Sequence, residues 1–152
     1  MIRRFRETDA EAVMRIWLAG NEDAHPFIPA AYWRSHFSAV REQIMQAELW
    51  VCEQEGEIQG FIGLAGDYIA GIFVDRTWRS RGIGRQLLDC AKREHPALSL
   101  HVYEKNWRAA AFYAREGFSV CGKERGADTG EAEYLMEWKQ NFSSILLRFN
   151  RS

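Results

Sequence analysis

Glycines and arginines are concentrated in one short segment of the chain, Arg79–Arg85 (RSRGIGR). The segment follows an apolar run from Ile69 to Val74 that predicts a strand, and it precedes a run with the apolar spacing of a helix. A turn at a helix N-terminus leaves backbone N–H groups without partners at the positive end of the helix dipole. Gly82 and Gly84 lack Cβ atoms, so a phosphate group can approach this backbone closely. The segment therefore predicts a site for a pyrophosphate group.

Three kinds of phosphate-binding turn can be compared with this segment. A P-loop requires Lys and then Ser or Thr after its last glycine, but Arg85 and Gln86 stand there. A dinucleotide-binding turn requires a third glycine, and Leu87 occupies that position. The pattern Arg/Gln-x-x-Gly-x-Gly/Ala, between a strand and a helix, is matched in full by Arg79–Gly84. The alternative to a ligand site is an ordinary surface turn whose arginines serve solubility.

The length of 152 residues predicts about one domain, and contents of 47% apolar and 27% charged residues are typical of a soluble globular protein. A net charge of −1 creates no general attraction for nucleic acid or an anionic membrane, so we expect neither as a partner. The sequence has no apolar run long enough for a membrane span and no signal-peptide core. The isolated cysteines Cys52, Cys90 and Cys121 suit buried free thiols, so we expect a cytoplasmic protein.

The apolar spacing predicts strands and helices that alternate along the chain. Strands are expected at 2–6, 49–54, 57–65, 69–74, around 98–102, 118–123 and 133–139. Helices are expected from a capping box at Thr8–Glu11, over Trp33–Ile44, from the glycine turn to His95, and from Asn106 to Glu116. This order predicts a mixed α/β domain over residues 1–139.

A tail over residues 140–152 follows the last expected strand. Phe142, Ile145, Leu146 and Phe149 have the spacing of one apolar helix face. Such a face fits packing against the tail's own domain, or a contact with a partner or in a homodimer.

Two separated blocks of the sequence resemble the GNAT superfamily of acyl-CoA-dependent N-acyltransferases. The first is Ile72–Asp75 followed by the glycine turn. The second has the spacing N-x3-A-x2-Y-x3-G-F, formed by Asn106, Ala110, Tyr113, Gly117 and Phe118. The segment His25–Ile28, followed by Tyr32 and Trp33, is similar to small single-domain bacterial acetyltransferases. The resemblance implies the GNAT fold: a mixed, mostly antiparallel sheet of about seven strands, splayed between the fourth and fifth strands and flanked by about four helices.

The resemblance also implies a site for acetyl-CoA as co-substrate, with no metal. Its binding residues would be Phe73, Val74, Arg79, Arg81, Gly82, Ile83, Gly84, Arg85 and Asn106. Backbone groups near Phe73 and Val74 would pair with pantetheine and hold the thioester oxygen. Tyr113 stands at the family's position for the general acid that protonates the leaving thiolate. The alternatives are a core aromatic role for Tyr113 and a helix N-cap role for Asn106.

The sequence does not identify a general base. The strand Ile69–Val74 lacks the glutamate that some GNAT members carry there, which leaves Asp67, Glu53, Glu104 and His25 as candidates. We therefore expect deprotonation through water. The acceptor amine is expected at His25, Phe27 and Trp33, because aromatic faces attract cations. Simple packing of Phe27 and Trp33 onto the sheet is the alternative.

These expectations together predict an N-acetyltransferase. It would transfer an acetyl group from acetyl-CoA to a primary amine of a small molecule or peptide, by direct attack in a ternary complex. The alternative is a non-catalytic acyl-CoA-binding regulatory module on the same fold. The presence of both Tyr113 and Asn106 favours the enzyme, because a sensor needs no proton donor. A nucleic-acid or phosphoprotein binder would need a wider basic stripe than this chain has.

Overall fold

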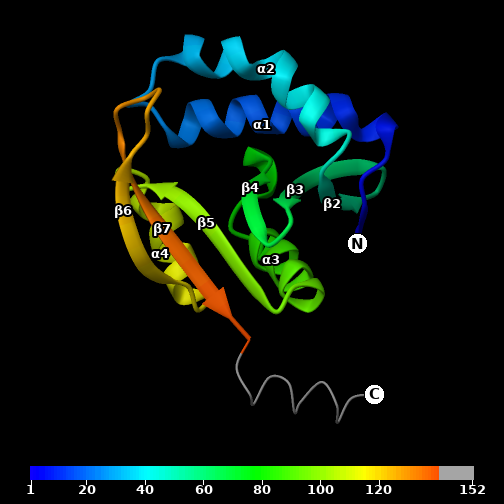
Figure 1. Cartoon of the computed structure of the whole chain (residues 1–152). Helices are drawn as coiled ribbons and strands as arrows, with labels where there is room; N and C mark the ends of the chain where they lie inside the picture. Colours follow the sequence, from blue (N-terminus) through cyan, green and yellow to red (C-terminus); the bar gives the residue numbers. More distant parts are fainter. Residues whose placement is uncertain (141–152) are drawn as a thin grey trace.

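A seven-stranded sheet forms the centre of the computed structural model, which describes residues 1–140 (Figure 1). The strands lie in the order β1-β2-β3-β4-β5-β7-β6. Their bounds are β1 Ile2–Arg4, β2 Glu48–Gln54, β3 Glu57–Ala65, β4 Tyr68–Val74, β5 Ala97–Tyr103, β6 Ser119–Arg125 and β7 Ala132–Lys139. The helices are α1 Ala10–Ala24, α2 Ala30–Ile44, α3 Ile83–Glu94 and α4 Trp107–Arg115. This is the mixed, mostly antiparallel sheet that the resemblance to the GNAT superfamily implied.

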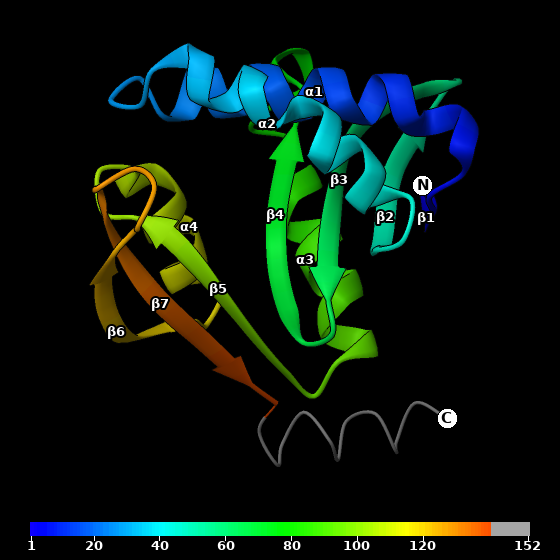
Figure 2. The same ribbon diagram turned by 45° about the horizontal axis from the view of Figure 1, so that its top comes forward.

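Strands β4 and β5 are the one parallel pair of this sheet, and they separate almost at once. They pair only at Tyr68 with Ser99 and at Ile69 with Leu100. Beyond these two pairs β4 continues along β3, while β5 turns away along β7, and Figure 2 shows the V that results. The expected splay between the fourth and fifth strands is confirmed. Because nothing in the sheet pairs with the inner edge of β4 here, its backbone groups are available to a ligand.

The helices cover the two faces of the sheet differently. Helix α3 packs on β2, β3 and β4 from one side, and α1 packs on β3 and β4 from the other, with α2 lying alongside α1 (Figure 1). Helix α4 packs on β5 from the α3 side. Alternate residues of β5 therefore differ in surroundings: Leu98, Leu100 and Val102 are buried in the α3–α4 core. We call the other side of β5, which carries Ser99, His101 and Tyr103, its polar face.

A β-bulge at Ala70 reverses the side-chain alternation of β4 next to the opening. Leu64 of β3 pairs with Ile69, but the preceding Gly63 pairs with Gly71, so Ala70 is an extra residue. Ile69 and Ile72 can therefore both join the α3–α4 core, while Phe73 packs with α1 on the opposite side. The bulge thus directs the Phe73 ring away from the α3 side of the V.

The helix and strand order predicted from the sequence is confirmed, with corrections in detail. The capping box at Thr8–Glu11 was wrong: a 3-10 turn precedes α1, and the Asp9 carboxylate accepts from the Arg6 N–H at 2.8 Å. Cys52 and Cys90 are buried, as predicted, but Cys121 is exposed because it lies on the edge strand β6. The predicted amphipathic helix at Phe142–Phe149 lies outside the described residues. Within residues 1–140, no helix is long and apolar enough to cross a membrane.

Candidate active site

The glycine turn, Arg79–Arg85, joins the open end of β4 to α3. A short 3-10 turn follows β4, and then Ser80 (φ 63°) and Gly82 (φ 79°) adopt left-handed backbone conformations. Gln86 donates the first helical hydrogen bond of α3, to the Gly82 carbonyl at 3.1 Å. Across residues 1–140, none of the backbone N–H groups from Arg81 to Arg85 donates a hydrogen bond. These amides form the N-terminal donor set that an anion can occupy.

The three arginines of the turn have weak partners at the surface. Arg79 lies 3.4 Å from Asp23 of α1, and Arg85 lies 3.5 Å from Glu116. The Arg81 guanidinium lies over the Trp78 ring, 5.1 Å from its centroid. Exposed ion pairs of this kind contribute little free energy, so the guanidinium groups can turn toward a phosphate at small cost.

Asn106 and Tyr113 lie on α4, on the same side of the sheet as α3. The Asn106 side-chain oxygen accepts from the Ala109 N–H at 3.3 Å, so Asn106 is the N-cap of α4. Tyr113 is buried, and its ring packs edge-on against Phe118. Burial raises the pKa of the Tyr113 hydroxyl, and the nearby Tyr68 phenol raises it further. The hydroxyl therefore stays protonated at neutral pH, as a proton donor must.

Four rings from the α1–α2 region and β5 form an aromatic cluster: His25, Phe27, Trp33 and Tyr103. The centroid of the His25 ring lies 4.8 Å from the centroid of the Tyr103 ring and 5.3 Å from that of the Trp33 ring. Burial lowers the pKa of His25 to about 4, so the ring is neutral, and its Nε2 lies 3.2 Å from the Asn106 amide nitrogen. Trp33 is buried and Phe27 is partly exposed. The structure therefore brings the three expected acceptor residues together beside the polar face of β5.

Comparison with known proteins identifies the family. Residues 45–120 match the family described as Acetyltransferase (GNAT) domain. Over 140 residues the chain is 34% identical to the peptidyl-lysine N-acetyltransferase YiaC of Escherichia coli (strain K12). The alignment covers 91% of this chain and 96% of that protein. The chain belongs to the GNAT acetyltransferase family. It is therefore an acyltransferase.

Solved structures agree with the GNAT assignment. The solution structure of apo YjaB from Escherichia coli has a TM-score of 0.81 and 29% identity, covering 93% of this chain and 98% of that chain. A proposed streptothricin acetyltransferase from Bacillus anthracis, in complex with acetyl coenzyme A, has a TM-score of 0.57 and 25% identity. It covers 62% of this chain and 63% of that chain.

The acidic residues considered as general bases in this GNAT protein are each paired with a basic side chain. Glu53 pairs with Arg3 at 2.8 Å on the β1–β2 side of the sheet. Asp67 pairs with His95 at 2.8 Å, at the closed end of the V. Glu104 lies 2.6 Å from Lys123. The lowered pKa of His25 makes that ring a poor proton acceptor. None of the four is an obvious base.

The sequence analysis missed a hydrogen-bonded row, Tyr68–His101–Glu124. The Tyr68 hydroxyl lies 2.8 Å from His101 Nδ1, and His101 Nε2 lies 2.6 Å from the Glu124 carboxylate. These residues come from β4, β5 and β6, and the sheet order alone brings them together. The available signal was the alternation of polar residues with apolar ones along β5, which indicates a strand face that no helix covers.

Proposed function

We propose that this GNAT protein transfers the acetyl group of acetyl-CoA to the side-chain amine of a lysine in a peptide or protein. The observation that carries the proposal is the two-sided opening between β4 and β5. The α3 side has the unpartnered amides of the glycine turn and the buried Tyr113 hydroxyl. The other side has the aromatic cluster and the polar face of β5. The peptidyl-lysine acetyltransferases YiaC and YjaB, which this chain is similar to, favour lysine as the acceptor.

The residues of the glycine turn fit the pyrophosphate of acetyl-CoA. The amides from Arg81 to Arg85 have no acceptor among the described residues. A Cβ atom added to Gly82 would meet nothing within 4 Å, so the space above the turn is open. Arg81 has an aromatic neighbour rather than a carboxylate, so it is the arginine that can contact phosphate without breaking an ion pair. The free edge of β4 at Phe73 and Val74 would hold the pantetheine arm, with Asn106 beside it.

Tyr113 would act as the general acid. Acetyl-CoA supplies a thioester whose carbonyl carbon a neutral amine can attack. The departing sulfur has a pKa of about 8.5 as a free thiol, so it is only weakly basic, and a nearby hydroxyl speeds its departure by donating a proton. Because burial raises the pKa of Tyr113, the hydroxyl carries that proton throughout the neutral range.

The aromatic cluster would hold the acceptor lysine. An aromatic face attracts an ammonium group, and the apolar ring edges pack against the lysine methylenes. The structure contains an example of this contact, because the Lys105 ammonium lies over the Phe27 ring at 5.5 Å from its centroid. His25 is neutral and adds no repulsive charge.

Two measurements test the proposal. The first is the change in melting temperature with acetyl-CoA, compared with ATP and NAD. At a ligand concentration of about 100 times the dissociation constant, binding adds about 2.7 kcal/mol to the free energy of unfolding. The second is thiol release with a peptide that has one internal lysine, compared with the same peptide carrying acetyl-lysine. Acetyl-CoA stabilisation with lysine-dependent thiol release is expected. Stabilisation without transfer to any amine would favour the regulatory-module alternative, and no stabilisation would contradict both.

A further inference from the structure

The Tyr68–His101–Glu124 row has a defined direction for proton movement. At 2.6 Å from Nε2, the Glu124 carboxylate can only accept, so His101 carries its proton on Nε2. A neutral imidazole then has a bare Nδ1, which accepts from the Tyr68 hydroxyl at 2.8 Å. The lone pairs of the Tyr68 oxygen are left to accept a hydrogen bond from another group. The row therefore begins with an acceptor at Tyr68 and ends at a carboxylate.

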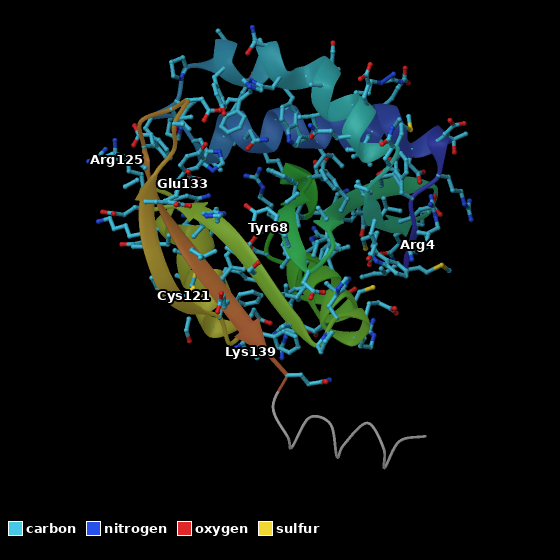
Figure 3. All side chains as sticks on the ribbon, viewed as in Figure 1. Arg4, Tyr68, Cys121, Arg125, Glu133 and Lys139 are labelled. Atoms are coloured by element: carbon cyan, nitrogen blue, oxygen red, sulfur yellow. The ribbon has the colours of Figure 1, made fainter. Side chains whose placement is uncertain are left out.

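The Tyr68 end of the row lies at the opening between β4 and β5. Tyr68 pairs with Ser99, one residue before Ile69–Leu100, the last pair before the strands separate, and Figure 3 shows Tyr68 between the two strands. After burial, the Tyr68 phenol is the second cause of the raised pKa of Tyr113. Tyr68 is half-buried.

The Glu124 end lies at the surface. The Glu124 side chain is 62% exposed, and it lines a polar cleft of about 470 Å³ with Glu104, Lys105, Lys123, Arg125, Glu131 and Ala132. The groups that face His101 are Tyr68 from β4, Glu124 from β6 and Glu133 from β7. The Glu133 side chain is half-buried with no hydrogen bond or ion pair among residues 1–140, and burial raises its pKa. Carboxylates on two strands, β6 and β7, therefore lie close to the His101 ring.

We propose that Tyr68, His101 and Glu124 form the proton-transfer chain that deprotonates the acceptor amine, and this inference rests on the proposed function. The ammonium donates a proton to the Tyr68 oxygen as the tyrosine's own proton moves to His101 Nδ1. The imidazolium, paired with Glu124, then returns to neutrality by releasing one proton to water through the exposed carboxylate. The amine is left with its lone pair, and no oxidant, reductant or further reactant is needed.

The proton count of the whole reaction agrees with this chain. An ammonium acceptor has three protons on nitrogen, and the amide product keeps one. One of the other two reaches the departing sulfur through Tyr113, and the other leaves through the row. The acid and the base of the reaction would therefore use separate groups, Tyr113 on α4 and the row that begins at Tyr68.

The pH dependence of acetyl transfer to the lysine peptide tests this chain. Tyr68→Phe and His101→Gln are each expected to lower kcat/KM about 50-fold near neutral pH. A free lysine amine has a pKa of about 10.4, so the loss should shrink toward high pH as the amine arrives neutral. It should shrink also with a thialysine peptide, whose amine is more acidic. Glu124→Gln is expected to lower kcat/KM about 5-fold, because water can replace an exposed carboxylate.

Tyr134→Phe is the matched control, because it removes a phenol from neighbouring β7 on the α3–α4 side and should leave the profile unchanged. The dissociation constant for acetyl-CoA, expected to stay within about twofold, shows that each variant is folded. If Tyr68→Phe and His101→Gln lower kcat/KM by the same factor at every pH, the residues have a structural role and the proposed proton-transfer chain is wrong. A kcat/KM equal to that of the wild-type protein in both variants would also contradict the proton-transfer chain. A wild-type protein that acetylates no amine contradicts the proposed function itself.

Discussion

The glycine turn and the polar face of β5 lie on opposite sides of one opening, and they are built in different ways. The turn uses backbone amides from one continuous segment, Arg81–Arg85. The polar face of β5 is completed by side chains from β4, β6 and the α1–α2 loop. The first depends on backbone conformation and the second on which residues the fold brings together. Substitutions should therefore affect the two sides through different measurable quantities.

The largest effect is expected from Gly82→Glu. The new carboxylate would occupy the space above the turn and repel pyrophosphate, so the acetyl-CoA dissociation constant should rise roughly 1,000-fold, or about 4.1 kcal/mol. Gly56→Glu is a matched control, because both glycines have φ 79° and open space where a Cβ atom would lie. Both variants bear the same left-handed strain of about 1 kcal/mol, but only Gly82→Glu should lose binding by calorimetry. Equal affinities would separate the turn from the cofactor site.

Tyr113→Phe should change the chemistry and leave cofactor binding intact. Loss of the proton donor is expected to lower kcat about 100-fold near neutral pH, while the acetyl-CoA dissociation constant stays within about twofold. The phenylalanine ring keeps the packing against Phe118. Rapid-quench assays and calorimetry on the same preparation measure both quantities. An unchanged kcat from about pH 6 to 9 would leave Tyr113 as a core aromatic residue.

Phe27→Ala tests the acceptor side of the comparison. Removing the ring should raise the KM for the lysine peptide about 5- to 10-fold, the size expected for a cation–π contact of about 1 kcal/mol. The acetyl-CoA dissociation constant should not change. Phe37→Ala provides the control, because Phe37 packs against Trp17 in the α1-side core and is not one of the four rings of the aromatic cluster. A peptide KM that moves equally in both variants would show a general loss of stability.

The smallest effect is expected at the closed end of the V, which belongs to neither side. His95 bonds Asp67 at 2.8 Å and Glu48 at 3.1 Å. Burial opposes its protonation, but the two carboxylates outweigh burial and raise the pKa of His95 above 6.5. A raised folded-state pKa contributes stability that is complete below about pH 6.5 and is lost as pH rises through the folded value.

His95→Gln should therefore lower the free energy of unfolding by roughly 1 kcal/mol more at about pH 6 than at about pH 9. Urea unfolding at the two pH values measures the difference. His36→Gln is the control, because the His36 ring bonds the Tyr32 carbonyl and not a carboxylate. A deficit for His95→Gln that is the same at both pH values would mean that the charge of His95 adds nothing to the network.

The same contrast explains what the sequence could predict. The glycine turn was visible because a ligand that binds backbone amides needs a contiguous segment with glycines at fixed positions. The helices and strands were visible through their apolar periods. The direction of Phe73 was not visible, because a single extra residue at Ala70 reverses the alternation.

The Tyr68–His101–Glu124 row was also invisible to sequence reasoning. Tyr68 and His101 are 33 residues apart in the chain, and His101 and Glu124 are 23 residues apart. His101 and Glu124 lie on β5 and β6, and the last strand of the sheet, β7, is inserted between them. No local propensity specifies that insertion, which follows from long-range pairing of the final hairpin with β5.

The two-pair junction between β4 and β5 also determines how the backbone exchanges hydrogen with solvent. Amides of residues 71–74 that point into the opening have no partner strand, so they can exchange with deuterium without any unfolding. Amides of β3 and β7, which are paired on both sides, exchange only when the sheet opens. A pantetheine arm that pairs with β4 would slow exchange at residues 71–74 and leave β3 and β7 unchanged, so exchange at this edge would report cofactor binding.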